Sequence, residues 1–197
     1  MNEAALEALL CRYSVGPKHL AAPGPDEEQL RRMVEVALRA PDHGELLPFR
    51  FKAVRSAAAR ARMAALFVAA ARKAGKDEAA CAIDAERALQ APLTVAVIAR
   101  IDLGHPQVPA HEQWACVGGA ITNFLNAAQL LGFGGKMLSG AKVRDADIAA
   151  AFCDAGETLL GWIALGTPMR RGRARAGSAN KGGVALALQA WGEDAPG

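Results

Sequence analysis

Apolar residues recur with a helical period in several stretches of the chain, and residues 26–40 show this most clearly. The apolar side chains that would share one helix face there are Leu30, Met33, Val34 and Ala37. Asp26 and Gln29 have the spacing of a capping box, which predicts that the helix begins at that point. Pro41 disfavours helical geometry in the residue before it, so we expect the helix to end near Ala40.

Similar patterns predict five more helices, over residues 3–11, 57–73, 78–89, 112–131 and 145–152. The helix over residues 112–131 is apolar on nearly all sides, which predicts a long, central and buried helix. It contains Gly118 and Gly119, each of which costs about 1 kcal/mol of helix propensity relative to alanine. We expect close packing against a neighbouring segment to offset that cost.

Four stretches have the character of β-strands. Residues 49–53 alternate between apolar and basic side chains, which predicts a half-buried strand. Residues 93–99 (LTVAVIA) are apolar throughout, which is typical of a strand with both faces covered. Shorter strands are predicted around residues 136–138 and 158–165. Helices and strands alternate without a linker or an internal repeat, so we expect one α+β or layered α/β domain over residues 1–197.

Composition supports a globular protein and argues against a nucleic-acid partner. Hydrophobic residues make up 52% of the chain and charged residues 22%, and the formal net charge is only +3. Much of the basic excess falls in the C-terminal segment, residues 169–197, which is basic at first and apolar again over residues 184–188. The basic run is either a solvated tail or a loop that contacts an anionic ligand. The apolar part has no place in the predicted core, so we expect it to pack on a partner subunit.

Cysteine usage and the N-terminal residues favour the cytoplasm. Cys11, Cys81, Cys116 and Cys153 form neither a C-x-x-C pair nor a zinc-ligand pattern, so free thiols in a reducing compartment are expected. The first ten residues contain two glutamates and no basic stretch, which is unlike a signal peptide. No apolar run reaches the roughly 20 residues that cross a bilayer, so we expect no membrane association.

Standard catalytic motifs are absent from the sequence. Ser14 and Ser139 lack the G-x-S-x-G pattern of a nucleophile elbow. The glycine-rich turn at 132–135 does not match a dinucleotide-binding G-x-G-x-x-G motif. His105 and His111 are six residues apart across two prolines and form at best a weak metal pair. We therefore predict no metal site and no catalytic nucleophile.

Arg12 and Ser14, which follow the first predicted helix, are candidate phosphate ligands. An arginine and a hydroxyl supply the charge and the directed donors that a phosphate monoester requires. The same two residues are also typical of a cation at a helix C-terminus followed by a turn. Taken alone, these two residues favour the ordinary turn.

Four short motifs together are more informative than any one of them. In chain order they are Arg12-Tyr13-Ser14, Arg39-Ala40-Pro41-Asp42-His43 with Pro48-Phe49 behind it, Leu131-Gly132-Phe133-Gly134-Gly135 followed by Ser139-Gly140, and Leu165-Gly166-Thr167-Pro168. In this order and spacing they resemble the compact, single-domain branch of the FMN-dependent nitroreductase superfamily. The resemblance extends over about residues 4–168.

The resemblance implies a fold, a cofactor and a set of ligand contacts. The fold would be a three-layer α/β/α arrangement with a mixed β-sheet, in a homodimer with two FMN sites at the subunit interface. Residues 123–128 would lie on the nicotinamide side of the site, and Arg39 would place positive charge near the pyrimidine end of the flavin. The residues implied to contact FMN are Arg12, Tyr13, Ser14, Arg39, His43, Met137, Leu138 and Ser139.

The activity implied by the resemblance is a ping-pong transfer of hydride. NADH or NADPH would reduce FMN, and FMN would then reduce a small, electron-poor acceptor such as a nitroaromatic or a quinone. The cofactor carries this chemistry, while the protein binds, orients and tunes it.

Several positions depart from the pattern of this branch. Tyr13 stands where an arginine is common, Leu47 where a glutamine is common, and Phe49 where a tryptophan is common. Met137-Leu138-Ser139 stands where the branch can have Trp-Arg-Ser. These changes remove polar flavin contacts, for which basic residues 170–175 could compensate. They leave open an alternative, a non-catalytic dimer that holds flavin or another planar ligand without efficient turnover.

Overall fold

The computed structural model describes residues 3–170 and 187–188. Its contacts divide the chain into two units, residues 14–171 and residues 1–13 with 172–197. Most of the predicted C-terminal extension, residues 169–197, lies outside the described residues. Its packing on a partner subunit and the single domain over residues 1–197 both stay predictions.

The smaller unit contains helix α1 (Glu3–Leu10) in its described part. The helix ends in two backbone hydrogen bonds, in which the N–H groups of Cys11 and Arg12 donate to the carbonyls of Glu7 and Leu9. Arg12 and Tyr13 belong to this unit.

The larger unit contains five α-helices, and sequence patterns predicted all of them to within two residues at most ends. They are α2 (Glu27–Ala37), α3 (Ala57–Lys73), α4 (Glu78–Leu89), α5 (Ala110–Leu130) and α6 (Ala146–Phe152). Both α3 and α4 match the predicted bounds. Each is preceded by an N-cap residue whose side chain accepts a hydrogen bond from a backbone N–H of the first turn, Ser56 for α3 and Asp77 for α4.

The predicted capping box at the start of α2 is confirmed. Gln29 N–H donates to Asp26 Oδ1 at 2.8 Å, and Asp26 N–H donates to Gln29 Oε1 at 2.9 Å. The helix ends at Ala37, three residues before the predicted end at Ala40. Tighter turns replace the last helical turn there, because Ala40 N–H bonds to the carbonyl three residues back rather than four.

Within the part of the chain that the structure describes, five strands form one sheet. They are β1 (Leu20–Ala21), β2 (Phe49–Val54), β3 (Leu93–Ala99), β4 (Gly134–Leu138) and β5 (Thr158–Pro168). The order is β1–β5–β3–β2, and β4 also pairs with β5.

Strand β1 was not predicted, because two residues are too few to show a pattern. The structure also corrects the expectation of a mixed sheet, since all pairs between described strands are antiparallel. Strands β3 and β4 run in the same direction, but β5 lies between them and opposes both.

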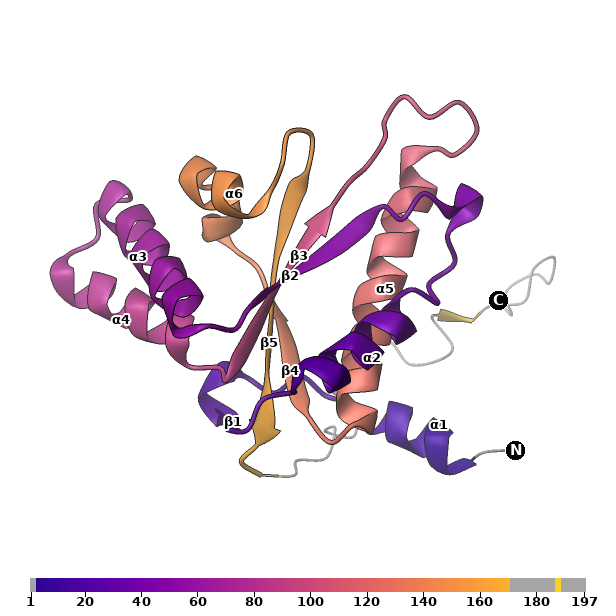
Figure 1. The fold of residues 1–197 in the computed structure, drawn as a ribbon, viewed down its shortest axis with the longest axis horizontal. Helices are drawn as coiled ribbons and strands as arrows, with labels where there is room; N and C mark the ends of the chain where they lie inside the picture. The colour runs from indigo at the N-terminus through magenta and orange to yellow at the C-terminus, as the bar shows by residue number, and fades with distance from the viewer. Residues whose placement is uncertain (1–2, 171–186, 189–197) are drawn as a thin grey trace, which may run out of the picture. The chain divides into compact units, whose positions relative to one another are not determined.

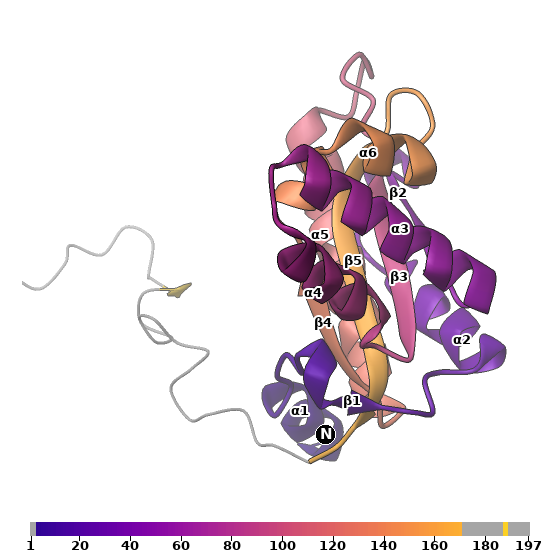
Figure 2. The ribbon, with the colours of Figure 1, turned by 90° about the vertical axis from the view of Figure 1, so that its left-hand side faces the viewer.

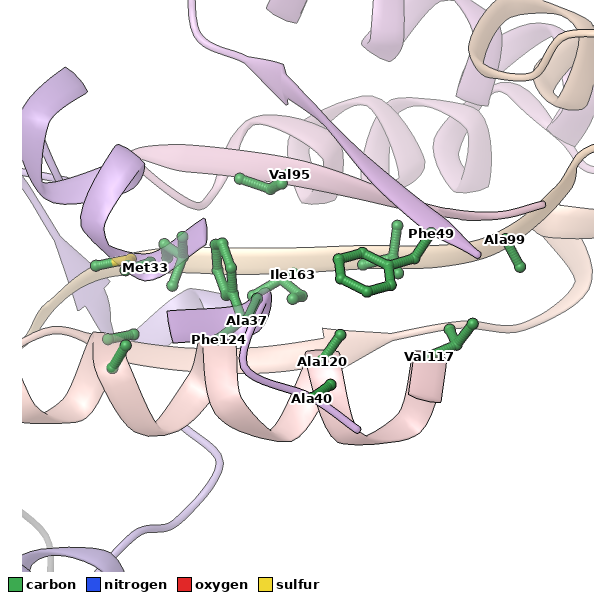
Figure 3. Close-up of a cluster of buried hydrophobic side chains, with 14 of the residues drawn as sticks. Met33, Ala37, Ala40, Phe49, Val95, Ala99, Val117, Ala120, Phe124 and Ile163 are labelled. Atoms are coloured by element: carbon green, nitrogen blue, oxygen red, sulfur yellow. The ribbon is translucent and has the colours of Figure 1, made fainter. Parts of the chain in front are cut away.

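Helices cover both faces of this sheet, as the three-layer prediction requires (Figures 1 and 2). Alternate residues of β3 belong to two separate cores. Val95, Val97 and Ala99 pack with α2 and α5, whereas Ala96 and Ile98 pack with α3, α4 and α6. Strand β3 is buried along its whole length. Figure 3 shows the first core, in which Phe124 of α5 and Met33 of α2 meet the sheet.

Helix α5 is long and central, as predicted, but only one of its faces is buried. Phe124 and Ala120 face the sheet and are fully buried, whereas Trp114 on the other face is 38% exposed. A Cβ atom added at Gly119 would lie 3.3 Å from the Cβ of Ala40, so this glycine permits the close packing expected of it. At Gly118 such an atom would meet nothing within 4 Å. The outer face of α5 is therefore open among the described residues.

Candidate functional site

A cavity of about 540 Å³ lies on the face of the sheet that α3 and α4 cover. This volume is within the usual range for small-molecule and cofactor sites. Strands β3, β4 and β5 contribute Thr94, Leu138 and Trp162, and helix α3 contributes Phe67. Two segments that lie far apart in sequence complete the lining, residues 16–18 and residues 139–142.

Backbone pairing brings these two segments to one place. Val15 N–H donates to the carbonyl of Gly135 at 3.1 Å, which holds the chain after Ser14 against β4. Strand β4 ends at Leu138, and Gly140 has a φ of 144°, a conformation that side-chain-bearing residues rarely adopt. The chain can therefore turn sharply after Ser139 into the 3₁₀ helix Ala141–Arg144 at the cavity.

The residues at the end of β4 that are implied to contact FMN do not all face the same side of the sheet. Leu138 and Ser139 line the cavity. Met137 points the other way and packs against the core formed with α2 and α5. Strand geometry explains this division, because successive side chains point to opposite faces. Ser14 precedes the lining segment by two residues and is exposed.

Arg39 and His43 do not line this cavity. Both are exposed and follow α2, in the helical layer on the opposite face of the sheet. His43 Nδ1 lies 2.7 Å from Glu112 Oε2, in the first turn of α5. A single chain therefore brings Leu138 and Ser139 together with the segment after Ser14, but it keeps Arg39 and His43 apart from them.

Sequence reasoning missed the charged side chains of the cavity. Its lining includes the four cationic residues Lys18, Arg87, Lys136 and Lys142 and the single acidic residue Asp84. Lys136 could have been found from strand periodicity, because it is two residues before Leu138 and so shares its face. Asp84 and Arg87 lie on α4, and Lys18 and Lys142 lie in short 3₁₀ helices. At these four positions the sequence pattern does not indicate that the side chain lines a cavity.

Asp84 is deeply buried and neutralises part of this charge. Its Oδ2 lies 2.8 Å from Lys76 Nζ and 3.1 Å from Lys142 Nζ, and its Oδ1 lies 3.9 Å from Arg87 Nη1. Burial alone would raise the pKa of Asp84, but the hydrogen bonds from Lys76 and Lys142 outweigh it and lower the pKa below its usual value. Asp84 is therefore a carboxylate that holds the 139–142 segment against α4.

Residues 10–167 match the family model described as the Nitroreductase family. The chain belongs to the nitroreductase family. It is therefore an enzyme of the oxidoreductase class, and the family predicted from the four motifs is confirmed.

Two bacterial members of the nitroreductase family illustrate the similarity. The chain is 34% identical over 165 residues to "Putative NAD(P)H nitroreductase YdjA" of Escherichia coli, which covers 83% of this chain and 88% of the relative. It is 33% identical over 168 residues to "Putative NAD(P)H nitroreductase" of Haemophilus influenzae, which covers 85% and 90% of the two chains.

Solved structures confirm the nitroreductase fold. A nitroreductase-like family protein from Bacillus cereus superimposes with a TM-score of 0.72 at 18% identity, over 87% of this chain and 89% of that one. A protein from Desulfovibrio desulfuricans, described as "a putative nitroreductase in complex with fmn", superimposes with a TM-score of 0.68 at 22% identity over the full length of both chains.

The chemistry of the cavity fits an anionic ligand that carries hydrogen-bond acceptors. Positive side chains outnumber negative ones in the lining. Trp162 is 5% exposed and lines the cavity, and its Nε1–H finds no acceptor in the part of the chain that the structure describes. A buried donor without an acceptor is costly, so a ligand with acceptor atoms would suit this site. Among the described residues, no three potential metal ligands cluster, and no helix is long and apolar enough to span a membrane.

Proposed function

We propose that this protein is an FMN-dependent oxidoreductase that uses NADH or NADPH to reduce a small, electron-poor acceptor such as a nitroaromatic or a quinone. One observation carries the proposal. The cavity beside β4 is lined by Leu138 and Ser139, which belong to the motif implied to contact FMN, and it has a cationic lining. The names of the two bacterial relatives and the FMN complex of a protein with the same fold support this choice.

The chain's own residues would bind and orient the cofactor. Arg12 and Ser14 would supply a cation and a hydroxyl that suit the phosphate, and the resemblance implies that Tyr13 also contacts the flavin. Leu138, Trp162 and Ala164 give the cavity apolar groups on the sheet side, which would limit the access of water to a bound ligand there. When bound, FMN would accept a hydride from the nicotinamide and pass it to the acceptor, so no side-chain nucleophile is required.

Arg39 and His43 would serve the cavity of a partner subunit rather than that of their own chain. They lie outside the cavity of their own chain, although their motif is one of those implied to contact FMN. Glu112 would hold the imidazole of His43 through Nδ1 and leave Nε2 to face the ligand. A homodimer with two shared sites follows from this arrangement, and the free thiols of the chain suit the cytoplasm.

An absorbance spectrum of the purified protein tests the proposal. We expect flavin bands after reconstitution with FMN, and bleaching of these bands by NADH or NADPH under anaerobic conditions. Return of the bands on addition of a nitroaromatic or a quinone would complete the cycle. Bound flavin that neither nicotinamide bleaches would favour the non-catalytic alternative. Failure to bind FMN would refute the proposed function and would leave, of that alternative, only a dimer that holds another planar ligand.

A further inference from the structure

Lys136 lies on β4 and lines the candidate flavin cavity. It shares a strand face with Leu138, because residues two apart in a strand point the same way. Its partner in the ladder is Ala164 of β5, which also lines the cavity and has a side chain too short to obstruct the lysine. The ammonium group therefore has access to the cavity from the sheet side.

Two of the other three cations of the cavity already interact with an acid. Lys142 and Arg87 both lie near the buried carboxylate of Asp84, at 3.1 Å and 3.9 Å. In contrast, Lys136 forms no ion pair with any described residue. The fourth cation, Lys18, lies in the short 3₁₀ helix Pro17–His19 rather than on the sheet. Lys136 is thus the positive charge on the sheet side that a bound anion could neutralise.

We propose that Lys136 is a cofactor-binding residue that pairs with an anionic oxygen or nitrogen of the flavin. This inference rests on the proposed function. The anion is either the phosphate of FMN or the pyrimidine edge of the reduced ring, both of which present negative charge to an ammonium group. Lys136 then supplies, from the same strand face, the positive charge that Leu138 does not.

FMN and riboflavin affinities, measured by fluorescence quenching, test this role. The variants are Lys136→Gln and, as a control, Lys52→Gln, which removes the same charge from β2. Lys52 pairs with Ala96 and so lies on the same face of the sheet, but on the edge strand farthest from the cavity. We expect Lys136→Gln to weaken FMN binding about tenfold or more relative to wild type, and Lys52→Gln to leave it unchanged.

Riboflavin, which lacks the phosphate, identifies the anion. A loss confined to FMN assigns Lys136 to the phosphate. An equal loss for riboflavin, or a lower reduction potential of the flavin bound to Lys136→Gln, assigns it to the ring. Lys136→Arg keeps the charge and should retain most of the affinity, and melting of the apo forms shows whether any variant fails to fold.

The outcomes separate this inference from the function on which it rests. If wild type binds FMN and Lys136→Gln binds it equally well, with an unchanged reduction potential of the bound flavin, the role of Lys136 is wrong and the proposed function stands. Equal losses of FMN affinity in Lys136→Gln and Lys52→Gln would also overturn the role of Lys136. The loss would then come from the lower net charge of the protein and not from a contact between Lys136 and the flavin. If wild type itself does not bind FMN, the proposed function fails first.

Discussion

Side-chain direction along β4 determines which residues can contact a ligand. Met137 and Leu138 are neighbours in a motif, yet the first packs into the core with α2 and α5 and the second faces the cavity. Leu138 is half-buried and belongs to neither hydrophobic core. A longer polar side chain at position 138 can therefore extend into the cavity without displacing core residues.

Leu138→Arg should tighten FMN binding by about 1–2 kcal/mol, since a guanidinium would gain a charge-assisted hydrogen bond to the phosphate or the pyrimidine edge. Fluorescence quenching measures the affinity, and the melting temperature of the apo form checks the fold. The apo form should melt close to wild type. A collapsed apo melt would instead show that Leu138 packs inside the protein, because the arginine would then be an unpaired buried charge.

Gly161 allows β5 to approach β4 closely beside the cavity. Its φ is 145°, and a Cβ atom added there would collide with the carbonyl of Leu138. Gly161→Ala should destabilise the protein by about 2 kcal/mol or more, as measured by urea unfolding. Gly75→Ala is the matched control, because Gly75 also has positive φ but no atom within 4 Å of the added Cβ. A cost for Gly161→Ala no greater than that for Gly75→Ala would show that the contact with Leu138 is unimportant.

At the scale of elements, an ion pair joins β2 to the loop before β5. Arg50 Nε lies 2.6 Å from Glu157 Oε1, and the side chain of Glu157 is only 7% exposed. The hydrogen bond from Arg50 lowers the pKa of Glu157 to about 2. A carboxyl whose pKa is lower in the folded state stabilises that state above its ordinary pKa, and this contribution is lost as the pH falls through the folded-state pKa.

Protonation of Glu157 should therefore lower the free energy of unfolding as the pH falls from about 4.5 to 2. We expect wild type to exceed Glu157→Gln in unfolding free energy by about 2–3 kcal/mol at pH 6, and the difference to shrink steadily below pH 4.5. Urea unfolding of both proteins at several pH values measures this difference. A difference that stays constant down to pH 2.5 would mean that the carboxylate of Glu157 does not contribute through its charge.

Sequence patterns were sufficient to predict the bounds of elements that have strong periodicity or clear caps. Helices α3 and α4 and strand β3 occupy the predicted residues, because propensity, burial and capping agree there. The same patterns missed the two-residue strand β1, and the resemblance implied a mixed sheet where the described strands pair antiparallel. Both depend on contacts between segments far apart in sequence, such as Leu20 with Pro168. Leu138 and Ser139, which the resemblance implies as FMN contacts, line the cavity, whereas Asp84 and Arg87 of α4 gave no sequence signal of facing it.

At the scale of the whole molecule, the open face of α5 and the positions of Arg39 and His43 both favour a symmetric dimer. Trp114 is partly exposed on that face, and Gly118 leaves room for close approach of another chain. An interface above about 2,000 Å² would be expected for an obligate dimer of this kind. Light scattering at micromolar concentration should therefore report twice the mass of the chain, and a monomer would contradict this expectation.

If each site combines a cavity from one subunit with Arg39 and His43 from the other, two defective variants should complement each other. One variant carries Leu138→Glu, which puts a carboxylate into the cavity, and the other carries Arg39→Ala with His43→Ala. Each alone should lose most FMN binding. After unfolding together and refolding, half of the dimers are mixed, and each mixed dimer contains one site in which every contributing residue is wild type. About a quarter of all sites should then recover wild-type affinity in a flavin titration. Each variant refolded alone is the control. A mixture that forms dimers but recovers no tight sites would show that Arg39 and His43 do not act across the interface.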